Sequence, residues 1–199
     1  MAEKWWKQYL VDVPPGKLNG VEVCPMEVTK EGASLHNLRE VVHGSDRVIV
    51  PGMFTALYVQ GDLWMSDTPT ELVDLEDFRH AIKPGHTVLI HGLGLGCAVK
   101  MAFEHGAELV KVIEINPDII ELVGSHWKKR YGGRLEIVQG DALTWRPVKG
   151  AHWNVVWHDI WPGISKENVP EMKRLHRRFT RRADWQGSWC RYESEHNRF

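Results

Sequence analysis

The sequence has few cysteines and no long apolar run. Its three cysteines, Cys24, Cys97 and Cys190, are odd in number and widely spaced, a pattern that argues against a disulfide framework and against a zinc site. No apolar stretch approaches the length of a membrane span, and the first ten residues lack the apolar region of a signal peptide. We therefore expect a cytoplasmic protein with no membrane partner and no bound metal ion.

The sequence also has no large excess of either charge. Its 199 residues carry a formal net charge of −1, and 43% of them are hydrophobic and 26% charged. The whole chain is therefore not a polycation, and it can bury a sizeable core. The charge is unevenly distributed, because the segment from Lys166 to the C-terminus has a net charge of +4 and the rest has −5. We expect one globular domain with a smaller additional unit.

The pattern that organises the chain is a strand, a glycine turn and a helix from Thr87 to His105. Val88 to Ile90 is an apolar run typical of a buried parallel strand, and Gly92, Gly94 and Gly96 follow at alternate positions. Glycines at such a corner let the backbone turn tightly and bring its amides close to a ligand, at the positive end of the helix dipole. The turn therefore predicts a pocket that binds a nucleotide.

A second strand, Val110 to Ile115, contains Glu114 near its end, twenty residues after Gly94. An acidic side chain at this distance can accept hydrogen bonds from both hydroxyls of a ribose. NAD is a competing ligand, but its G-x-G-x-x-G pattern places the third glycine one residue later than Gly96 does here. A plain corner that binds no ligand is the remaining alternative.

At this point the chain resembles the cofactor half of class I S-adenosylmethionine-dependent methyltransferases, and within that superfamily it is most similar to the spermidine-synthase-like branch. The resemblance covers about half the chain, from Gly61 to Gly163. The segments that carry it are VLIHGLGLG (Val88 to Gly96), VIEIN (Val112 to Asn116), GDA (Gly140 to Ala142) and VVWHDIWP (Val155 to Pro162). It implies S-adenosyl-L-methionine as cofactor and a Rossmann-like parallel sheet with helices on both faces.

The resemblance also implies roles for residues at the ends of the predicted strands. Ile115, Asp141 and Ala142 match cofactor-binding positions, and the last two are where the family recognises adenine. Asp159 matches the position that faces the acceptor, so we expect it to be the catalytic residue. Independently of the resemblance, we expect Trp161 and Pro162 to contact the substrate, because the Trp161 ring can stack on a planar acceptor such as a nucleobase or an aromatic ring. The alternatives are an Asp141 that only caps the next turn and a Trp161 that is only a hydrophobic lid.

Two departures from spermidine synthases count against aminopropyl transfer. Those enzymes carry an Asp between the last two glycines, where this chain has Leu95, and a second carboxylate three residues after the position of Asp159. An amine acceptor needs anionic partners and a base, and the loss of two carboxylates weakens both. A methyltransferase is therefore favoured. An aminopropyltransferase acting on a polyamine and a non-catalytic nucleotide-binding module remain as alternatives.

The N-terminal part, residues 1–69, has little helical periodicity and frequent turn residues, so it is predicted to be a small β-rich appendage to a domain of residues 70–199. Val21 to Val28 and Arg47 to Val50 are expected strands. Thr55 to Val59 and Leu63 to Ser66 look like a hairpin around Gln60-Gly61.

The segment after the hairpin, Ser66 to Glu71, is typical of a helix start. Asp67 or Thr68 can serve as the N-cap before Pro69, and Glu71 can complete a capping box with Thr68. A loop that closes over the cofactor is the functional alternative. A single helix is expected to follow from Leu72 to Ile82.

The chain is too short for the seven strands of the complete family sheet. After a fourth strand, Trp153 to His158, the remaining residues can form one helix from Lys166 to about Arg182 and a fifth strand near Trp185 to Tyr192. The prediction is thus a methyltransferase fold truncated at its C-terminal end. Because an unpaired sheet edge is a liability, we expect it to be covered by a homodimer contact or by Trp185, Trp189 and Tyr192.

The ten residues from Lys173 to Arg182 are a dense basic run. Met172, Leu175 and Phe179 recur at helical spacing and predict one apolar stripe, with the arginines on the other faces. A solvated helix face is the simpler interpretation. The alternative is a surface that binds phosphates, which would make a nucleic acid or nucleotide the substrate.

Overall fold

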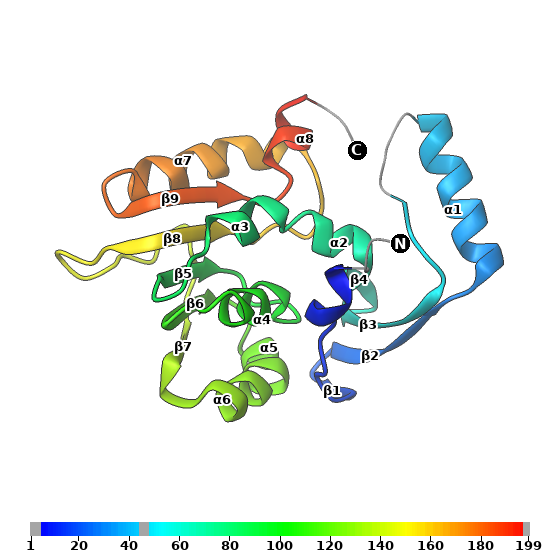
Figure 1. Cartoon of the computed structure of the whole chain (residues 1–199), viewed down its shortest axis with the longest axis horizontal. Coiled ribbons are helices and arrows are strands. Elements are labelled where there is room, and N and C mark those ends of the chain that lie inside the picture. Colours follow the sequence, from blue (N-terminus) through cyan, green and yellow to red (C-terminus); the bar gives the residue numbers. More distant parts are fainter. Residues whose placement is uncertain (1–4, 44–47, 197–199) are drawn as a thin grey trace.

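The structure, a computed structural model, describes residues 5–43 and 48–196 and contains one parallel and one antiparallel sheet (Figure 1). The parallel sheet has the strand order β7-β6-β5-β8-β9, and every neighbouring pair runs parallel. Its strands are β5 (Thr87–His91), β6 (Leu109–Glu114), β7 (Leu135–Gln139), β8 (Trp153–His158) and β9 (Ala183–Ser188). The predicted Rossmann-like sheet of five strands is confirmed.

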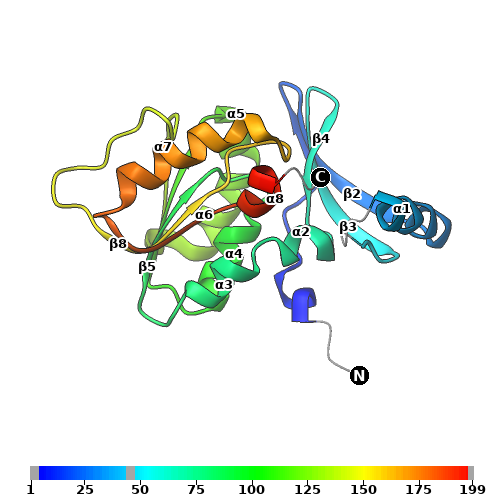
Figure 2. The same ribbon diagram turned by 90° about the horizontal axis from the view of Figure 1, so that it is seen from above.

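Helices cover both faces of the parallel sheet, as predicted (Figure 2). One face is covered by α3 (Glu76–Ala81), α4 (Cys97–Glu104) and α6 (Ser125–Tyr131), from which Phe78, Met101 and Trp127 are fully buried. The other face is covered by α7 (Val169–Phe179), which a 3-10 turn at Lys166–Asn168 precedes. Its apolar stripe of Met172, Leu175 and Phe179 is completely buried, which confirms the periodicity seen in the sequence.

Arg178 on α7 holds the loop that joins β7 to β8. Its guanidinium donates to the carbonyl oxygens of Ala142 at 2.7 Å, Leu143 and Trp145. Backbone carbonyls in a loop without regular structure need such partners once they are partly buried. One arginine of the basic run is therefore structural.

The N-terminal sheet is antiparallel, with the order β1-β2-β3-β4. Its strands are β1 (Gly16–Leu18), β2 (Val21–Val28), β3 (Gly52–Val59) and β4 (Asp62–Ser66), so the predicted hairpin is confirmed. Gln60 and Gly61, at its tip, both have positive φ, the geometry of a tight hairpin turn. Val21, Val23, Leu57 and Val59 belong to the same core as the parallel sheet, so the two sheets share one interior.

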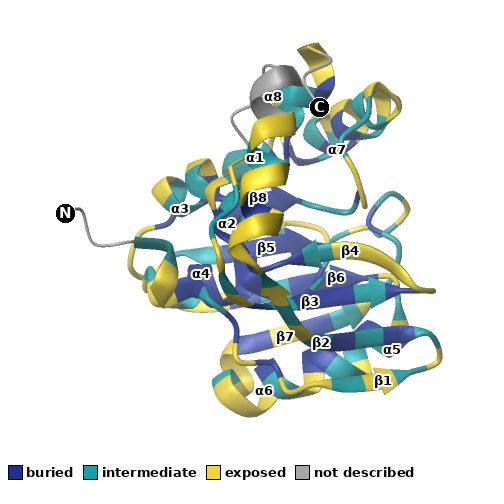
Figure 3. Cartoon of the chain, turned by 90° about the vertical axis from the view of Figure 1, so that its right-hand side faces the viewer, coloured by how far each residue is buried: buried dark blue, intermediate teal, exposed yellow. Residues whose placement is uncertain are grey.

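The prediction that the N-terminal part lacks helix was wrong at α1 (Lys30–His43). This helix projects from the end of the N-terminal sheet, and most of its surface is exposed (Figure 3). Leu35 and Leu38 are 53% and 63% exposed, so residues 30–39 of the helix contain no buried apolar stripe whose periodicity the sequence would reveal. The expected strand at Arg47 to Val50 is not formed at residues 48–50, and Arg47 lies outside the described residues.

The single helix expected from Leu72 to Ile82 is interrupted. It forms as α2 (Pro69–Val73) and α3, separated by a turn at Asp74 and Leu75. Thr68 is the N-cap residue and Pro69 follows it, but the Thr68 side chain makes no capping hydrogen bond, so the expected capping box was wrong.

Polar groups before α2 are instead used to connect segments. The Thr68 hydroxyl pairs with the Ser66 hydroxyl at 3.0 Å. Buried Asp67 accepts from the amides of Val11 at 2.8 Å and Thr55 at 2.6 Å. Burial raises the pKa of the Asp67 carboxyl, and the two amides oppose that shift.

The helix that follows β6 begins at α5 (Pro117–Ile119), where the Asn116 side chain accepts from the Asp118 amide at 2.9 Å. It continues through a π-helical turn at Ile120–Gly124 into α6. The remaining elements are a 3-10 turn at Trp5–Tyr9, another at Gly132–Arg134 and α8 (Arg191–His196).

The outer edge of β9 pairs with no other strand among residues 5–43 and 48–196. Trp185 stacks on Trp157 with ring centroids 6.3 Å apart, and the Trp189 indole donates to Asp74. Tyr192 is 54% exposed, so the three expected aromatic residues do not form one cover. Within the part of the chain that the structure describes, none of the helices has the length and apolarity needed to span a membrane.

Candidate functional site

A cleft of about 270 Å³ opens where the carboxyl ends of β5, β6, β7 and β8 meet. This edge is where ligands collect in open parallel sheets. The hairpin of β3 and β4 and the start of α2 form its other wall. Of the residues that the sequence predicts to form the site, nine line it: Gly92, Gly94, Glu114, Ile115, Asp141, Ala142, Asp159, Trp161 and Pro162.

The three glycines of the turn have positive φ and leave no room for a side chain. A Cβ at Gly92 would collide with the carbonyl oxygen of Asp159, and one at Gly94 would collide with the sulfur of Met65. Gly96, which the sequence assigned to cofactor binding, does not line the cleft, because the Trp127 indole packs against it. Its role in the structure is to allow α4 and α6 to approach.

Met65, on β4, lies directly over the glycine turn. Its thioether sulfur accepts from the Leu95 amide at 3.1 Å. A sulfur atom is a weak acceptor, so a stronger acceptor such as a carboxylate would replace it at this amide. The N-terminal sheet thus contributes a side chain at the point where the sequence predicts ligand contact.

Glu114 ends β6 with its carboxylate held by the backbone. One oxygen accepts from the Leu93 amide at 2.7 Å and the other from the Asn116 amide at 2.8 Å. The residue is only 5% exposed, and this burial raises the pKa of its carboxyl while the two amides lower it. Each oxygen keeps a second lone pair, so the fixed carboxylate can still accept hydroxyl groups.

Asp141 and Ala142 follow β7. One Asp141 carboxylate oxygen accepts from the Leu143 amide at 2.7 Å, which is the turn-capping role that the sequence left as an alternative. Asp141 is half-buried and still lines the cleft, and Ala142 is buried there. Ile115, 62% exposed beside Glu114, offers an apolar surface at the same edge.

Asp159 follows β8, and its backbone amide donates to His91 at the end of β5. The residue is half-buried, but its carboxyl group is desolvated, which raises its pKa to about 7. Asp74 and Glu114 raise it further through like charge, and the Trp157 indole opposes the shift. A carboxyl that titrates near neutral pH is suited to general base catalysis.

Trp161 is fixed rather than free to move as a lid. Its indole N–H donates to Glu171 on α7 at 2.8 Å, and only 7% of the residue is exposed. The ring still forms part of the cleft wall, whereas Pro162 next to it is exposed at the rim.

The cleft is strongly anionic. Its lining includes five carboxyl groups, those of Glu71, Glu114, Asp141, Asp159 and Glu171. No lysine, arginine or histidine among the described residues lines it. Such a wall attracts a cationic ligand and repels phosphate groups.

Two histidines beneath the cleft floor form a buried pair. His91 and His158 stack with centroids 4.9 Å apart, and their Nδ1 atoms are 2.7 Å apart. Gln186 donates to the His176 carbonyl, so its oxygen faces His158 Nε2. His158 therefore carries its proton on Nε2 and accepts at Nδ1 from His91.

Burial holds both histidines of this pair in the neutral form. It lowers the pKa of His91 to about 3 and that of His158 well below its usual range. Neither ring lines the cleft, so the pair packs the sheet rather than facing a ligand.

Sequence reasoning missed several residues of the cleft wall: Leu57, Trp64, Met65, Glu171 and Trp189. They come from the N-terminal hairpin, α7 and the turn after β9, and no local pattern connects these segments. Glu71 carried a signal, because the sequence allowed its loop to close over the cofactor, and it does line the cleft. Groups of acidic, histidine or cysteine side chains suited to hold a metal ion do not occur among the described residues.

Comparison with known proteins gives structural matches only, since no protein-family model and no curated protein matches this sequence. A candidate RNA methyltransferase from Pyrococcus horikoshii is 18% identical, with a TM-score of 0.45 over 60% of this chain and 54% of that one. A dimethyladenosine transferase from Plasmodium falciparum is 24% identical, with a TM-score of 0.41 over 52% of this chain and 35% of that one.

Protein arginine methyltransferase 10 from Arabidopsis thaliana is 16% identical, with a TM-score of 0.42 over 54% of this chain and 31% of that one. The chain spans little more than half the length of the first of these structures and about a third of the other two. The first and third of these proteins are described as methyltransferases and the second as a dimethyladenosine transferase, and none of the three as a spermidine synthase.

Proposed function

We propose that the chain is an S-adenosylmethionine-dependent methyltransferase whose acceptor is an amine. The observation that carries this proposal is the anionic cleft at the carboxyl edge of the sheet, with no cationic side chain among its described lining residues. S-adenosylmethionine is a sulfonium with an ammonium group, so carboxylates favour it. NAD would place its two phosphates in a cleft lined by five carboxyl groups, and no cationic side chain among the described lining residues would offset the repulsion.

In this proposal the chain's own residues bind the cofactor in three places. Glu114, fixed by two backbone amides, accepts the ribose hydroxyls, and Ile115 with Ala142 packs against the adenine. The Leu95 amide, bound only to the Met65 sulfur, is available to a carboxylate. Asp141 supplies an acceptor for the adenine amino group.

The transfer itself needs the acceptor nitrogen in line with the methyl–sulfur bond, and positioning contributes much of the rate. The nitrogen lone pair forms the new N–CH₃ bond, the S–CH₃ bond breaks, and its electron pair stays on the departing thioether. Asp159, with a pKa of about 7, removes the acceptor's proton. Glu171 and Glu71 add negative charge that favours a cationic amine in the same cleft.

The same charge also favours a second candidate, aminopropyl transfer to a polyamine. That reaction uses the decarboxylated cofactor, which needs no donor for a carboxylate. The two candidates therefore differ in cofactor preference.

Calorimetric titration with S-adenosylmethionine, S-adenosylhomocysteine, decarboxylated S-adenosylmethionine and NAD in parallel tests the proposal. We expect micromolar binding of the first two and weak binding of the others. Preference for the decarboxylated cofactor, with turnover of putrescine, would replace methyl transfer by aminopropyl transfer. Binding of NAD alone, or of none of the four, would refute both candidates.

Asp159→Ala separates the binding role from the catalytic role. The variant should bind S-adenosylmethionine as the wild type does and lose methyl transfer to small amines. Loss of cofactor binding would instead assign Asp159 to the cofactor site, and unchanged methyl transfer would remove Asp159 from the catalytic role. Cofactor binding without turnover in the wild type would favour a binding module.

A further inference from the structure

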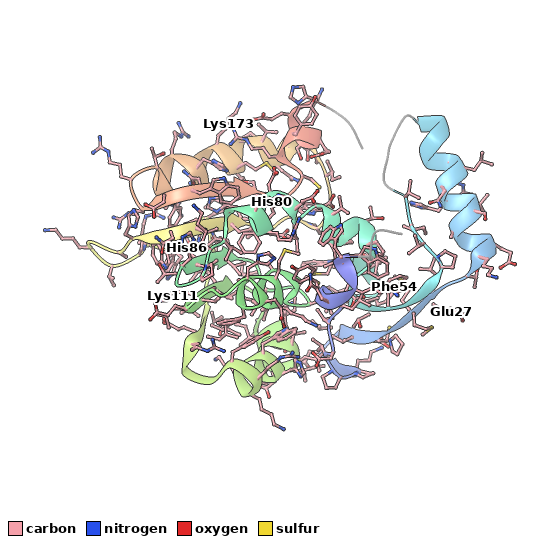
Figure 4. The ribbon with its side chains drawn as sticks, in the orientation of Figure 1. Glu27, Phe54, His80, His86, Lys111 and Lys173 are labelled. Atoms are coloured by element: carbon pink, nitrogen blue, oxygen red, sulfur yellow. The ribbon has the colours of Figure 1, made fainter. Side chains whose placement is uncertain are left out.

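The outer face of α7 carries a group of exposed cations that the proposed function does not use. With about 100° between successive residues, Lys173, Arg174 and Arg177 fall on the side of α7 opposite the buried stripe, and Arg181 follows in the turn after the helix. All four are exposed, and Lys173 lies on the outer side of α7 (Figure 4). We refer to these four residues as the α7 basic face.

None of the four cations forms an ion pair with a carboxylate in the described ranges. Three acidic residues on neighbouring segments have other partners: Glu171 with Trp161, Asp184 with Asn154 and Glu195 with Arg191. The positive charge of this face is therefore not neutralised within the described structure, and it is open to an external anion.

A hollow adjoins the C-terminal end of the α7 basic face. It is lined by His152, Arg177, Arg178, Arg181 and Arg182, among others. Arg178 and Arg182 are held in place by backbone carbonyls of the loop before β8. Burial lowers the pKa of Arg178 most, and the positive charges of Arg146 and Arg174 lower it further, which shows that like charges lie close together here.

The hollow and the cleft lie at opposite edges of the parallel sheet. Residues 150–152 precede β8 and residues 180–182 precede β9, so the hollow is at the amino ends of the strands. The cleft is at their carboxyl ends. The basic face is thus a surface separate from the anionic cleft.

We propose that the α7 basic face binds the phosphate backbone of a nucleic acid. Three of its four cations are arginines, whose planar guanidinium binds phosphate through two hydrogen bonds. From Lys173 to Arg177 the helix rises about 6 Å, which is close to two phosphate spacings along one strand of a duplex.

A membrane surface fits this face less well. Helices that lie on membranes insert apolar side chains, but Met172, Leu175 and Phe179 of α7 are already buried against the sheet. No apolar residue lies among the four cations on the exposed side of α7. The chemistry therefore favours a soluble polyanion with regularly spaced phosphates.

The test is fluorescence anisotropy of a labelled 20-nucleotide single-stranded DNA and the matching RNA, titrated with the full chain. We expect dissociation constants in the micromolar range at 50 mM NaCl and affinity that falls as salt is raised. Lys173→Gln, Arg174→Gln, Arg177→Gln and Arg181→Gln combined should weaken binding at least tenfold. The slope of log K against log salt should decrease by about 3 for four lost phosphate contacts on a single strand.

The matched control carries the same loss of four charges at exposed lysines on other elements: Lys7→Gln, Lys83→Gln, Lys128→Gln and Lys129→Gln. It should keep nearly wild-type affinity, and both variants should keep the wild-type melting temperature. Equal losses in the two variants, or no binding by the wild type, would overturn the proposal. Binding to vesicles containing phosphatidylserine without binding to either oligonucleotide would overturn the choice of nucleic acid. Cofactor titration is independent of these outcomes.

Discussion

Asp159→Asn should stabilise the protein, and the gain should depend on pH. In the folded chain the pKa of Asp159 is about 7, against an ordinary value of 3.8. A raised pKa in an acid means that the folded state binds the proton more tightly than the unfolded state. The free energy of unfolding therefore falls as pH rises from the pKa of the unfolded state to that of the folded state, because the buried carboxyl resists ionisation. A difference of about three units corresponds to about 4 kcal/mol once pH exceeds 7.

Urea unfolding of the wild type and Asp159→Asn at half-unit steps from pH 5.5 to 8.5 measures this effect. The gain in free energy of unfolding should grow by about 1.4 kcal/mol per pH unit up to pH 7 and then level off. Asp62→Asn, at the exposed end of the hairpin, is the control for removing any one carboxylate. A gain that is the same at every pH, or equal for both variants, would refute the assignment of a desolvated carboxyl.

Four further predictions concern the cleft and its support. Glu114→Ala should weaken S-adenosylmethionine binding by about 1–3 kcal/mol in calorimetry, because hydrogen bonds to a charged group are lost; unchanged affinity would remove Glu114 from the site. Gly94→Ala should unfold at lower urea than the wild type, since its Cβ meets the Met65 sulfur at positive φ, and Met65→Ala added to it should recover part of the loss. Arg178→Met should cost about 2–4 kcal/mol of unfolding free energy, because three carbonyls lose a charged donor; a loss below 0.5 kcal/mol would show that the loop holds itself. Because the pKa of His91 is lowered to about 3, stability should fall as pH drops below about 6.5, and His91→Phe should reduce that fall in urea titrations at pH 4.5–7.

The parallel sheet was predictable because its strands are buried on both faces and read as continuous apolar runs. Val88 to Ile90 and Val155 to Val156 show this, and the glycines after β5 fix where the first strand ends. The helix α1 was not predicted, for the opposite reason. Leu35 and Leu38 face solvent, so nothing in the sequence marks a face that is being buried.

The candidate site was predictable only where it follows the ends of strands. Glu114, Asp141 and Asp159 each come after or at the end of an apolar run, and the topology brings these positions to one edge. Trp64, Glu171 and Trp189 come from segments whose placement depends on how the hairpin, α7 and β9 pack, and a single sequence does not encode those contacts in a local pattern. Gly96 does not line the cleft although the pattern included it, because a glycine required for packing against Trp127 has the same sequence signature as one required by a ligand.

The two halves of the cleft place different demands on the chain. The half formed by β5, β6 and β7 is held by backbone contacts: Glu114 by two amides and Asp141 by one, so these side chains have little freedom to adapt. The opposite half is held by side-chain contacts, such as that between Trp161 and Glu171. A half that is held by backbone contacts suits a ligand that does not vary, such as the cofactor. A half that is held by side-chain contacts can change through substitution. We therefore expect the choice of acceptor to depend on Glu171 and its neighbours. Glu171→Gln should therefore change the KM for amine acceptors while leaving cofactor affinity unaltered, and an equal loss of both would show that the two halves are not independent.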